Sequence, residues 1–262
     1  MALATLAVLV LAVARSGHQD AAAPDDRLVV RVLDVGQGDA ILLDPPGGEP
    51  VLVDTGPPGS GIADRLHELG VDSLAAVMIS HDASDHAGGL GEVLDSLQVD
   101  RVVTGPDGPR RTTADGAAPV QLVEGGEIDS GELSLTALWP PPELTARAVD
   151  DPNRISLVIL AEWRHFSMLL TGDAEAEMAP VALPPIDVLK VAHHGSADPG
   201  LDSFLDRAIP KLAVISVGEN SYGHPTPETL TELREHDVPT LRTDEAGEVE
   251  IDADASSWRV EG

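Results

Sequence analysis

The sequence contains no cysteine, and only 2% of its 262 residues are aromatic. Without cysteine there are no disulfide bonds and no thiolate metal ligands, so any metal site has to be built from histidine, carboxylate and amide side chains. The scarcity of aromatic residues argues against an aromatic cage for a cationic ligand such as choline. The candidates for such a cage are Trp139, Trp163, Trp258, Tyr222, Phe166 and Phe204.

Positive charge is also scarce. Lys190 and Lys211 are the only lysines, and the formal net charge is −29 at pH 7. Such a surface repels phosphodiester chains at long range. A nucleic-acid substrate would have to bind locally, through a metal ion and a few arginines such as Arg110, Arg111 and Arg154, or in salt that screens the remaining charge. The simpler interpretation is that the acidic surface reflects solubility or a saline host.

The apolar run at the start of the chain, residues 2–14, is short for a membrane span. At about 1.5 Å per residue it covers roughly 20 Å, against a hydrocarbon core of about 30 Å. It could be the end of a membrane segment, a signal peptide or a buried helix, and the lack of a preceding basic residue weakens the signal-peptide interpretation. We expect an apolar membrane segment or signal-like stretch over residues 1–15, a linker over 16–27 and one domain over 28–262.

Beyond this start, short apolar runs alternate with glycine-rich turns, which is typical of strands. Helical spacing predicts helices over residues 61–69, 90–97 and 228–236. Residues 105–131 are expected to be mostly loops on a sheet edge. Two β-rich halves, each with helices after its strands, predict an α/β domain of two sheets stacked face to face with helices outside. Strands are expected over residues 28–33, 40–43, 51–53, 74–79, 101–103, 120–123, 133–138, 156–161, 168–170, 188–192, 212–217, 240–242 and 249–251.

Histidine and aspartate are concentrated in one short segment. His81, Asp85 and His86 lie within six residues, directly after the apolar run 74–79. One loop can present all three side chains to an ion, and Gly88-Gly89 lets the chain turn into the next helix without a side-chain clash. The cluster therefore indicates a metal site at a strand end.

Two further apolar runs end in residues of the same types. Asp173 closely follows the run 168–170, and His193-His194 follow the run 188–192. Histidine and carboxylate side chains are ligands for divalent ions, and a two-ion centre needs a carboxylate that bridges ions about 3.5–4 Å apart. We predict that three strand ends converge on one or two divalent ions and that Asp173 is the bridge.

The order of these motifs resembles that of the metallo-β-lactamase superfamily, whose fold is an αββα sandwich. Further strings resemble the carboxy-terminal hydrolase domain of the ComEC-type competence (DNA internalization) proteins, and the resemblance covers residues 29–251. The superfamily motifs are Asp54-Thr55-Gly56, the segment from His81 to His86, Gly172-Asp173 and His193-His194-Gly195-Ser196. The strings shared with competence proteins are Leu33-Asp34-Val35-Gly36-Gln37-Gly38-Asp39-Ala40, Leu189-Lys190-Val191-Ala192-His193-His194-Gly195-Ser196 and Gly223-His224-Pro225.

This resemblance implies a mixed two-sheet αββα sandwich and a metal-dependent hydrolase. In the competence family the domain follows a multi-helix membrane channel for transforming DNA and degrades the strand that is not imported. We therefore expect a nuclease or phosphodiesterase whose substrate is single-stranded DNA and whose partner is the membrane channel portion of a competence system. The implied location is at the membrane, on the extracytoplasmic side. The oligomeric state is left open.

The sequence departs from the superfamily pattern at Ala83. The motif normally reads His-x-His-x-Asp-His, or His-x-Asp-x-Asp-His in many competence homologues, and alanine cannot bind a metal. The adjacent Asp82 could replace the missing ligand only through a local distortion, because neighbouring side chains of an extended segment point in opposite directions. The separate histidine motif of the superfamily is also absent, since only His165 falls in that interval. Asn153 matches a region where the competence family carries asparagine.

These departures predict two unequal metal positions. Asp85, His86, Asp173 and His194 suffice for one ion, with His193 as the alternative to His194. The other ion would have His81, the shared Asp173, and Asp82 or water. It should bind weakly or prefer a hard ion such as Mn²⁺, so we expect one or two ions of Zn²⁺ or Mn²⁺.

Catalytic roles follow from the same resemblance. Asp173 would bind the metal, and Asp54 would orient a ligand histidine. His193 would support a metal ligand from behind or contact a phosphate oxygen. His224 would donate a proton to the leaving oxygen or bind phosphate. Gln37 and Asp39 are expected to line the same face. A turn-capping role for Asp54 and a loop-packing role for His224 are the simpler alternatives.

Two other functions compete with DNA hydrolysis. One is hydrolysis of a smaller ester, as in phosphorylcholine esterases or lactamases. The other is a degenerate module that binds metal without turnover, which the alanine at position 83 favours.

Overall fold

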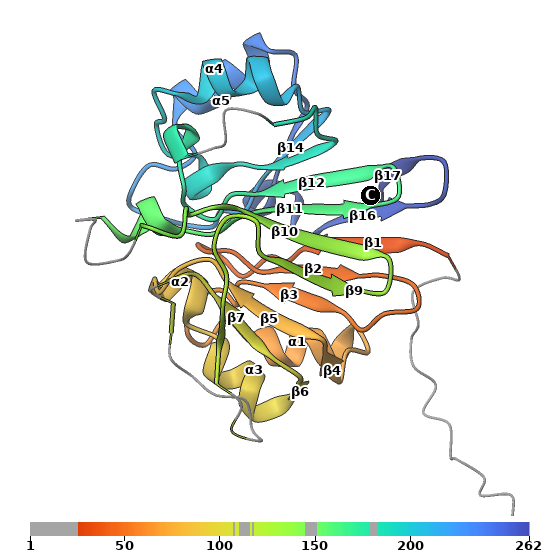
Figure 1. Ribbon diagram of the computed structural model, residues 1–262. Coiled ribbons are helices and arrows are strands. Elements are labelled where there is room, and N and C mark those ends of the chain that lie inside the picture. The colour runs from red at the N-terminus through yellow and green to blue at the C-terminus, as the bar shows by residue number, and fades with distance from the viewer. Residues whose placement is uncertain are drawn as a thin grey trace, which may run out of the picture.

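The computed structural model describes residues 26–106, 108–109, 116, 118–144, 151–178 and 183–261. Two large sheets lie face to face, with helices on their outer sides (Figure 1). This confirms the predicted αββα architecture. The expected membrane segment, residues 16–25 of the expected linker, Arg110 and Arg111 lie outside the described residues. Within the described part, no helix is long and apolar enough to cross a membrane.

The first sheet has eight strands in the order β17-β16-β1-β2-β3-β5-β7-β8. Pairing is antiparallel from β17 to β3 and parallel from β3 to β8. A separate pair, β4 (Ser73–Leu74) and β6 (Gln98–Val99), forms a small parallel sheet. The strands of the first sheet are β1 (Leu28–Val32), β2 (Ile41–Asp44), β3 (Val51–Val53), β5 (Ala76–Ile79), β7 (Val102–Thr104), β8 (Val120–Gln121), β16 (Val249–Ala253) and β17 (Trp258–Glu261).

The second sheet has seven strands in the order β15-β14-β13-β12-β11-β10-β9. Its strands are parallel from β15 to β12 and antiparallel from β12 to β9. They are β9 (Glu127–Ser130), β10 (Leu133–Trp139), β11 (Val158–Trp163), β12 (Phe166–Leu170), β13 (Val188–Lys190), β14 (Leu212–Ile215) and β15 (Thr240–Arg242).

Helices cover both outer faces, with α1 and α3 against the first sheet and α4 and α5 against the second (Figure 1). The α-helices are α1 (Ile62–Glu68), α2 (Ser84–Ala87), α3 (Leu90–Ser96), α4 (Leu201–Ala208), α5 (Pro227–Glu235) and α6 (Thr243–Ala246). Short 3-10 helices are η2 (Pro152–Ile155), η3 (Ala176–Met178) and η4 (Ala192–Gly195). The helices predicted over residues 61–69, 90–97 and 228–236 correspond to α1, α3 and α5.

The core is divided into three layers by the sheets. In β5, Ala76 and Met78 belong to the cluster between the sheets, whereas Val77 and Ile79 belong to the cluster under α1 and α3. Because successive side chains of a strand point to opposite faces, a strand buried on both sides has to be apolar at every position. This explains why the run before His81 is uninterrupted, and it fixes β5 in the sheet interior.

Some elements differ from the sequence-based prediction. Residues 127–130 form β9, although the segment was expected to be loop, because they pair with β10 across a tight turn at Gly131. The helix α4 was not predicted either. Its apolar residues Leu201, Phe204, Leu205 and Ala208 are buried at helical spacing, so the signal was present in the sequence.

The topology brings five strand ends to one edge. Strands β3 and β5 of the first sheet are parallel, and so are β12, β13 and β14 of the second. The carboxyl ends of parallel strands lie on the same side of a sheet, and functional residues gather there. The segments that follow these strands carry Asp54, His81, Asp173, His194 and Ser216.

Candidate metal centre

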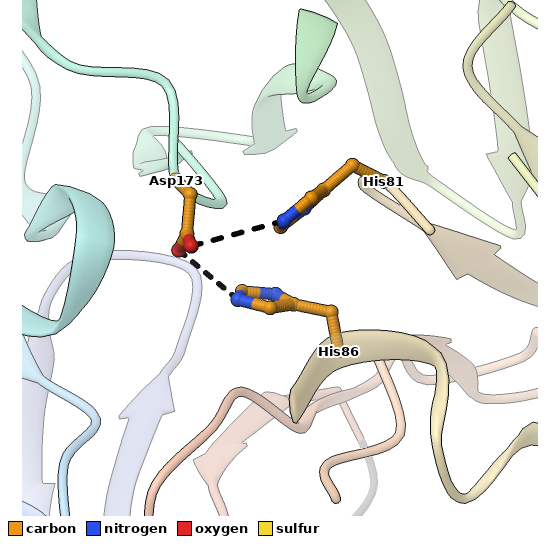
Figure 2. A group of neighbouring side chains, drawn as sticks. All are labelled: His81, His86 and Asp173. Carbon is orange, nitrogen blue, oxygen red and sulfur yellow. Dashed lines mark ion pairs between the residues drawn. The ribbon is translucent and has the colours of Figure 1, made fainter. Parts of the chain in front are cut away.

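Three buried side chains from both sheets face one another (Figure 2). His81 follows β5, His86 lies on α2 and Asp173 follows β12. The Nε2 atom of His86 is 3.0 Å from Oδ1 of Asp173, and Nε2 of His81 is 3.7 Å from Oδ2 of the same residue. Asp173 therefore presents one carboxylate oxygen to each histidine, as a bridging ligand does.

His194 approaches the same oxygen of Asp173 as His86 does, and Asp85 lies beside His194. The Nε2 atom of His194 is 3.4 Å from Oδ2 of Asp85 and 3.7 Å from Oδ1 of Asp173. Ligand atoms of Asp85, His86 and His194 lie within 4.8 Å of one another, and so do those of His81, His86 and Asp173. The structure thus brings together all five residues that the sequence predicts as metal ligands.

Hydrogen bonds at the Nδ1 atoms leave Nε2 of two histidines free to bind an ion. Nδ1 of His86 is 2.8 Å from Oδ2 of Asp54, and Nδ1 of His194 is 2.8 Å from the carbonyl oxygen of Ser216. Both partners can only accept here, so Nδ1 carries a proton in both histidines, and Nε2 is the atom left for an ion. Asp54 itself accepts from the backbone N–H of Ser80 at 2.7 Å and from its hydroxyl at 2.8 Å.

The donor set fits a divalent cation. Nε2 of His81, His86 and His194 and Oδ1 of Asp173 are buried without a hydrogen-bond partner among the described residues. Buried polar atoms are rarely unsatisfied, because each costs about 1–3 kcal/mol. Nitrogen and oxygen donors that converge in this way are what Zn²⁺ and related ions bind.

Charges in the centre shift the pKa values of its residues. Burial lowers the pKa of His86, but the carboxylates of Asp173 and Asp54 outweigh it and raise the pKa well above its ordinary value. Burial opposes ionisation of Asp173, yet the charge of His86 and the nearby cations hold its pKa well below the ordinary value. Partial burial raises the pKa of Asp85, but the nearby imidazoles of His194 and His86 outweigh it and lower the pKa to about 2. The carboxylates are therefore ionised, and an incoming ion competes with a proton for His86.

The turn Gly36-Gln37-Gly38 helps to hold the segment from His81 to His86 in place. The N–H of Asp39 donates to the carbonyl of Asp85 at 3.1 Å, and the N–H and hydroxyl of Thr55 both donate to the carbonyl of His86 at 2.7 and 2.9 Å. This contact needs Gly38, because a Cβ there would lie 2.3 Å from the Asp85 carbonyl oxygen.

Gly38→Ala should therefore push the two loops apart. We expect metal affinity to fall about 10-fold, in the range seen when outer partners of a metal ligand are removed. The matched control is Gly36→Ala, because Gly36 also has a positive φ but a Cβ there meets nothing within 4 Å. The control should lower stability by about 1–2 kcal/mol through backbone strain and leave metal affinity unchanged. Titration of the metal-free proteins with Zn²⁺ and thermal unfolding measure both effects.

An unusual turn aims His194 inward. His193 and His194 have positive φ values of 49° and 53°, and Gly195 follows at 81°. Such conformations are rare for residues other than glycine and persist where the surroundings enforce them. Here the N–H of His193 donates to the Gly172 carbonyl at 3.2 Å and that of Thr226 donates to the Gly195 carbonyl at 2.8 Å. As a result, His194 is buried, whereas the His193 side chain is 30% exposed.

The exposed side of the centre carries the two histidines predicted to act on substrate. Nε2 of His193 is 3.8 Å from Oδ2 of Asp173 and 3.4 Å from Nδ2 of Asn153. The His224 ring lies 5.4 Å from the His193 ring, and its Nδ1 is buried without a partner among the described residues. A pocket of about 180 Å³ opens beside His81, lined by Ser80, His81, Asp82, Gly108, Pro152 and Ile155.

At position 83, where the superfamily motif has a histidine or an aspartate, the structure offers no metal-binding atom. Ala83 is extended and caps α2, and the neighbouring Asp82 is exposed. His165 lies exposed in the turn between β11 and β12. Around Oδ2 of Asp173, the described part of the chain offers His81 at 3.7 Å and His193 at 3.8 Å. Fewer candidate donors therefore lie near Oδ2 of Asp173 than near Oδ1, and the two unequal metal positions stay a prediction.

Lys190 also belongs to the centre, although its sequence motif did not predict this. Its side chain is fully buried, contacts the carboxylate of Asp39 and donates to the Gly172 carbonyl at 3.0 Å. The signal was the position of this lysine, which ends an otherwise apolar strand in a chain with two lysines. A buried ammonium requires a partner, so an acid nearby could have been inferred. Asp39 was expected only to line the site face.

Comparison with sequence families supports this arrangement. The family model of the metallo-β-lactamase superfamily matches residues 33–219, which include every candidate ligand. ComE operon protein 3 of Bacillus subtilis is 30% identical over 257 residues, which cover 84% of this chain and 32% of that protein. Recombination protein 2 of Haemophilus influenzae is 32% identical over 233 residues, covering 85% and 28%. Competence protein ComA of Neisseria gonorrhoeae is 28% identical over 248 residues, covering 89% and 33%. The chain spans about a third of the length of these curated relatives.

Solved structures share the fold. The metallo-β-lactamase fold protein YhfI from Bacillus subtilis has a TM-score of 0.56 and 13% identity, covering 90% of this chain and 100% of YhfI. CmlA, a diiron β-hydroxylase from Streptomyces venezuelae, has a TM-score of 0.58 and 13% identity, covering 87% of this chain and 54% of CmlA. The fold therefore carries more than one chemistry, and the reaction has to be argued from the site. The order of motifs, the two-sheet sandwich and the family match together establish that this chain belongs to the metallo-β-lactamase superfamily.

Proposed function

We propose that this chain is a metal-dependent phosphodiesterase that hydrolyses single-stranded DNA, as the hydrolase domain of a ComEC-type DNA-uptake system. The observation that carries the proposal is the convergence of unsatisfied Nε2 atoms of His81, His86 and His194 on the Asp173 carboxylate. Similarity to proteins that are named for competence and recombination supports DNA as the substrate.

His81, Asp85, His86, Asp173 and His194 would hold one or two ions of Zn²⁺ or Mn²⁺. A bound divalent ion supplies Lewis acidity, which lowers the pKa of water and polarises a phosphoryl oxygen. The chain's own contribution is to fix the ligands. Asp54 and the Ser216 carbonyl hold the rings of His86 and His194 through Nδ1. Donors fixed before the substrate arrives need no reorganisation during the reaction.

His193 and His224 would act on the phosphate. Both lie on the open side of the centre, and Nδ1 of His224 has no partner among the described residues. Burial, followed by the charges of His193 and His194, lowers the pKa of His224 below its ordinary value. His224 is then mostly neutral at neutral pH. This favours contact with a phosphate oxygen over proton donation to the leaving group.

The acidic chain sets the conditions for DNA binding. With a net charge of −29, long-range repulsion of DNA is strong at low salt. Arg154 is the one described arginine among the three proposed for local binding, and it pairs with Glu177 at 2.5 Å. Phosphate binding would therefore depend mainly on the metal ion. DNA cleavage should accordingly increase when salt is raised from a few millimolar to about 0.15 M, since screening shortens the repulsion to about 8 Å.

Cleavage of labelled DNA tests the proposal directly. The full chain, freed of metal with a chelator, is incubated with single-stranded and duplex DNA and with Zn²⁺ or Mn²⁺. Metal-dependent cleavage of the single strand, lost on chelation and restored by metal, is the expected result. Absence of cleavage by a protein that binds metal would contradict DNA hydrolysis. Cleavage of a small phosphodiester but not of DNA would favour the smaller ester.

A metal-binding module without turnover is the second candidate, and Ala83 is the observation that favours it. Ala83→His should add an imidazole next to His81 and raise the metal content from one tightly held ion per chain toward two. Ala83→Leu is the control, because it adds bulk without a donor atom. Elemental analysis after gel filtration and DNA cleavage are the measurements. If wild-type protein is inactive and Ala83→His acquires Mn²⁺-stimulated cleavage, the natural chain is the module.

We further propose that the domain works on the extracytoplasmic side, next to the membrane channel of the uptake system. The support is that the relatives are competence proteins about three times as long as the aligned segment. Protease accessibility of the domain in intact cells would test this location.

A further inference from the structure

We propose that Lys190 lowers the affinity of the metal centre for its divalent cation by neutralising the buried carboxylate of Asp39. The inference rests on the metal centre of the proposed function and not on its substrate. It assigns a role to the one buried lysine of the described chain, which no step of hydrolysis uses.

Lys190 is a buried cation with two partners. It ends β13, in the interior of the second sheet, and none of its side chain is exposed. Its ammonium contacts the Asp39 carboxylate and donates to the Gly172 carbonyl at 3.0 Å. Gly172 directly precedes Asp173, so the ammonium lies behind the bridging carboxylate. An ammonium taken out of water is costly unless it is paired, and Asp39 is its only carboxylate partner among the described residues.

Asp39 lies behind two ligand histidines without fixing either ring. Its Oδ1 is 3.5 Å from Nδ1 of His194, and its Oδ2 is 3.7 Å from Nδ1 of His86. Closer acceptors already take those two Nδ1 protons, since Asp54 and the Ser216 carbonyl lie at 2.8 Å. Oδ2 of Asp39 is the atom that the Lys190 ammonium contacts, and Oδ1 has no hydrogen bond among the described residues. The influence of Asp39 on the histidines is therefore electrostatic.

The charges of the centre explain why an ammonium is placed there. Four carboxylates, those of Asp39, Asp54, Asp85 and Asp173, surround the histidines. With one divalent ion, the centre keeps one negative charge if Lys190 is present and two if it is absent. A carboxylate behind a ligand histidine makes the ring more basic, so the ion is held more tightly. The same negative charge neutralises the ion and makes it less electrophilic. Lys190 cancels this effect of Asp39 and leaves the ion more electrophilic.

Two single variants separate this role from a structural one. Lys190→Met leaves the Asp39 carboxylate without a countercharge, so metal affinity should rise about 10-fold. Asp39→Asn leaves an ammonium beside the ligands, so metal affinity should fall about 10-fold. Both variants break the same ion pair and both should lower the melting temperature of the metal-free protein. A purely structural pair would change metal affinity in the same direction in both variants.

The experiment is a metal titration without substrate. Zn²⁺ and Mn²⁺ affinities of the metal-free full chain are measured by competition with a chromophoric chelator at fixed pH and salt, alongside thermal unfolding. Asp39→Asn combined with Lys190→Met keeps the total charge of the wild type, and its affinity should lie within about 3-fold of wild type. Opposite shifts in the single variants support the proposal. Shifts of the same sign, or none, overturn it.

Each sign can be judged by itself if one variant does not fold. A folded Lys190→Met protein that binds the ion no more tightly than wild type contradicts the proposal, and so does a folded Asp39→Asn protein that binds it no more weakly. If neither single variant folds, the double variant decides, and an affinity more than about 10-fold from wild type overturns the inference. A chain that shows the opposite shifts but cleaves no DNA would refute the DNA proposal and leave this one standing.

Discussion

Asp173→Asn should remove tight metal binding and, with it, the proposed hydrolysis. Asp173 is 3% exposed and gives one oxygen to each side of the centre, toward His86 at 3.0 Å and His81 at 3.7 Å. Asparagine keeps the shape but replaces one oxygen with an N–H donor that points at a lone pair or an ion. Metal affinity should fall by more than about 100-fold, because even the loss of an outer partner of a ligand costs about 10–100-fold.

The control for this change is Asp202→Asn. Asp202 lies in α4, its side chain is 70% exposed, and it pairs with His236 at 2.9 Å, outside the centre. The same chemical change there should leave metal affinity and DNA cleavage within about 2-fold of wild type, since exposed pairs contribute little. Metal titration and cleavage of labelled DNA are compared for the three proteins. Full metal binding or equal cleavage by Asp173→Asn would eliminate Asp173 as the bridge.

Asp54→Asn should weaken metal binding by about 10–100-fold, although Asp54 touches no ion. Its carboxylate accepts three hydrogen bonds, from the Ser80 N–H, the Ser80 hydroxyl and Nδ1 of His86. An asparagine amide would turn an N–H group toward one of these donors. The His86 proton would then move to Nε2, the atom that has to face the ion.

The backbone at position 54 makes this variant a clean test. Asp54 has a φ of 60°, a conformation that asparagine also tolerates, so the turn should be preserved. Asp187→Asn is the matched control, because Asp187 is also buried and also accepts several hydrogen bonds. It lies near the starts of β12 and β13, whereas the metal centre lies at the other ends of these strands. The control should lose stability and keep its metal affinity. Nitrogen NMR of the histidine rings reports the tautomer, and an unchanged tautomer of His86 in Asp54→Asn would refute this explanation.

The sequence predicted a metal-binding segment from His81 to His86 and a sandwich of two sheets, because both depend on local patterns. Alternating or continuous apolar runs indicate strands, and polar residues directly after them indicate strand ends. This predicted His81, Asp85, His86, Asp173 and one of His193 or His194 as candidate ligands, and the structure brings these side chains together. The alanine at position 83 was equally visible in the sequence. In contrast, β9 becomes a strand only by pairing with β10, which no local pattern encodes.

The tertiary structure alone decided how the ligands are supported. The choice of His194 as the inward histidine depends on a turn with two successive positive φ values, fixed by contacts to Gly172 and Pro225-Thr226. Lys190 and Asp39 are 151 positions apart in the sequence and come from different sheets, yet they meet behind the centre. Periodicity reports the environment of each strand by itself. Which buried charges meet depends on the register and stacking of the sheets, and these are set by long-range contacts.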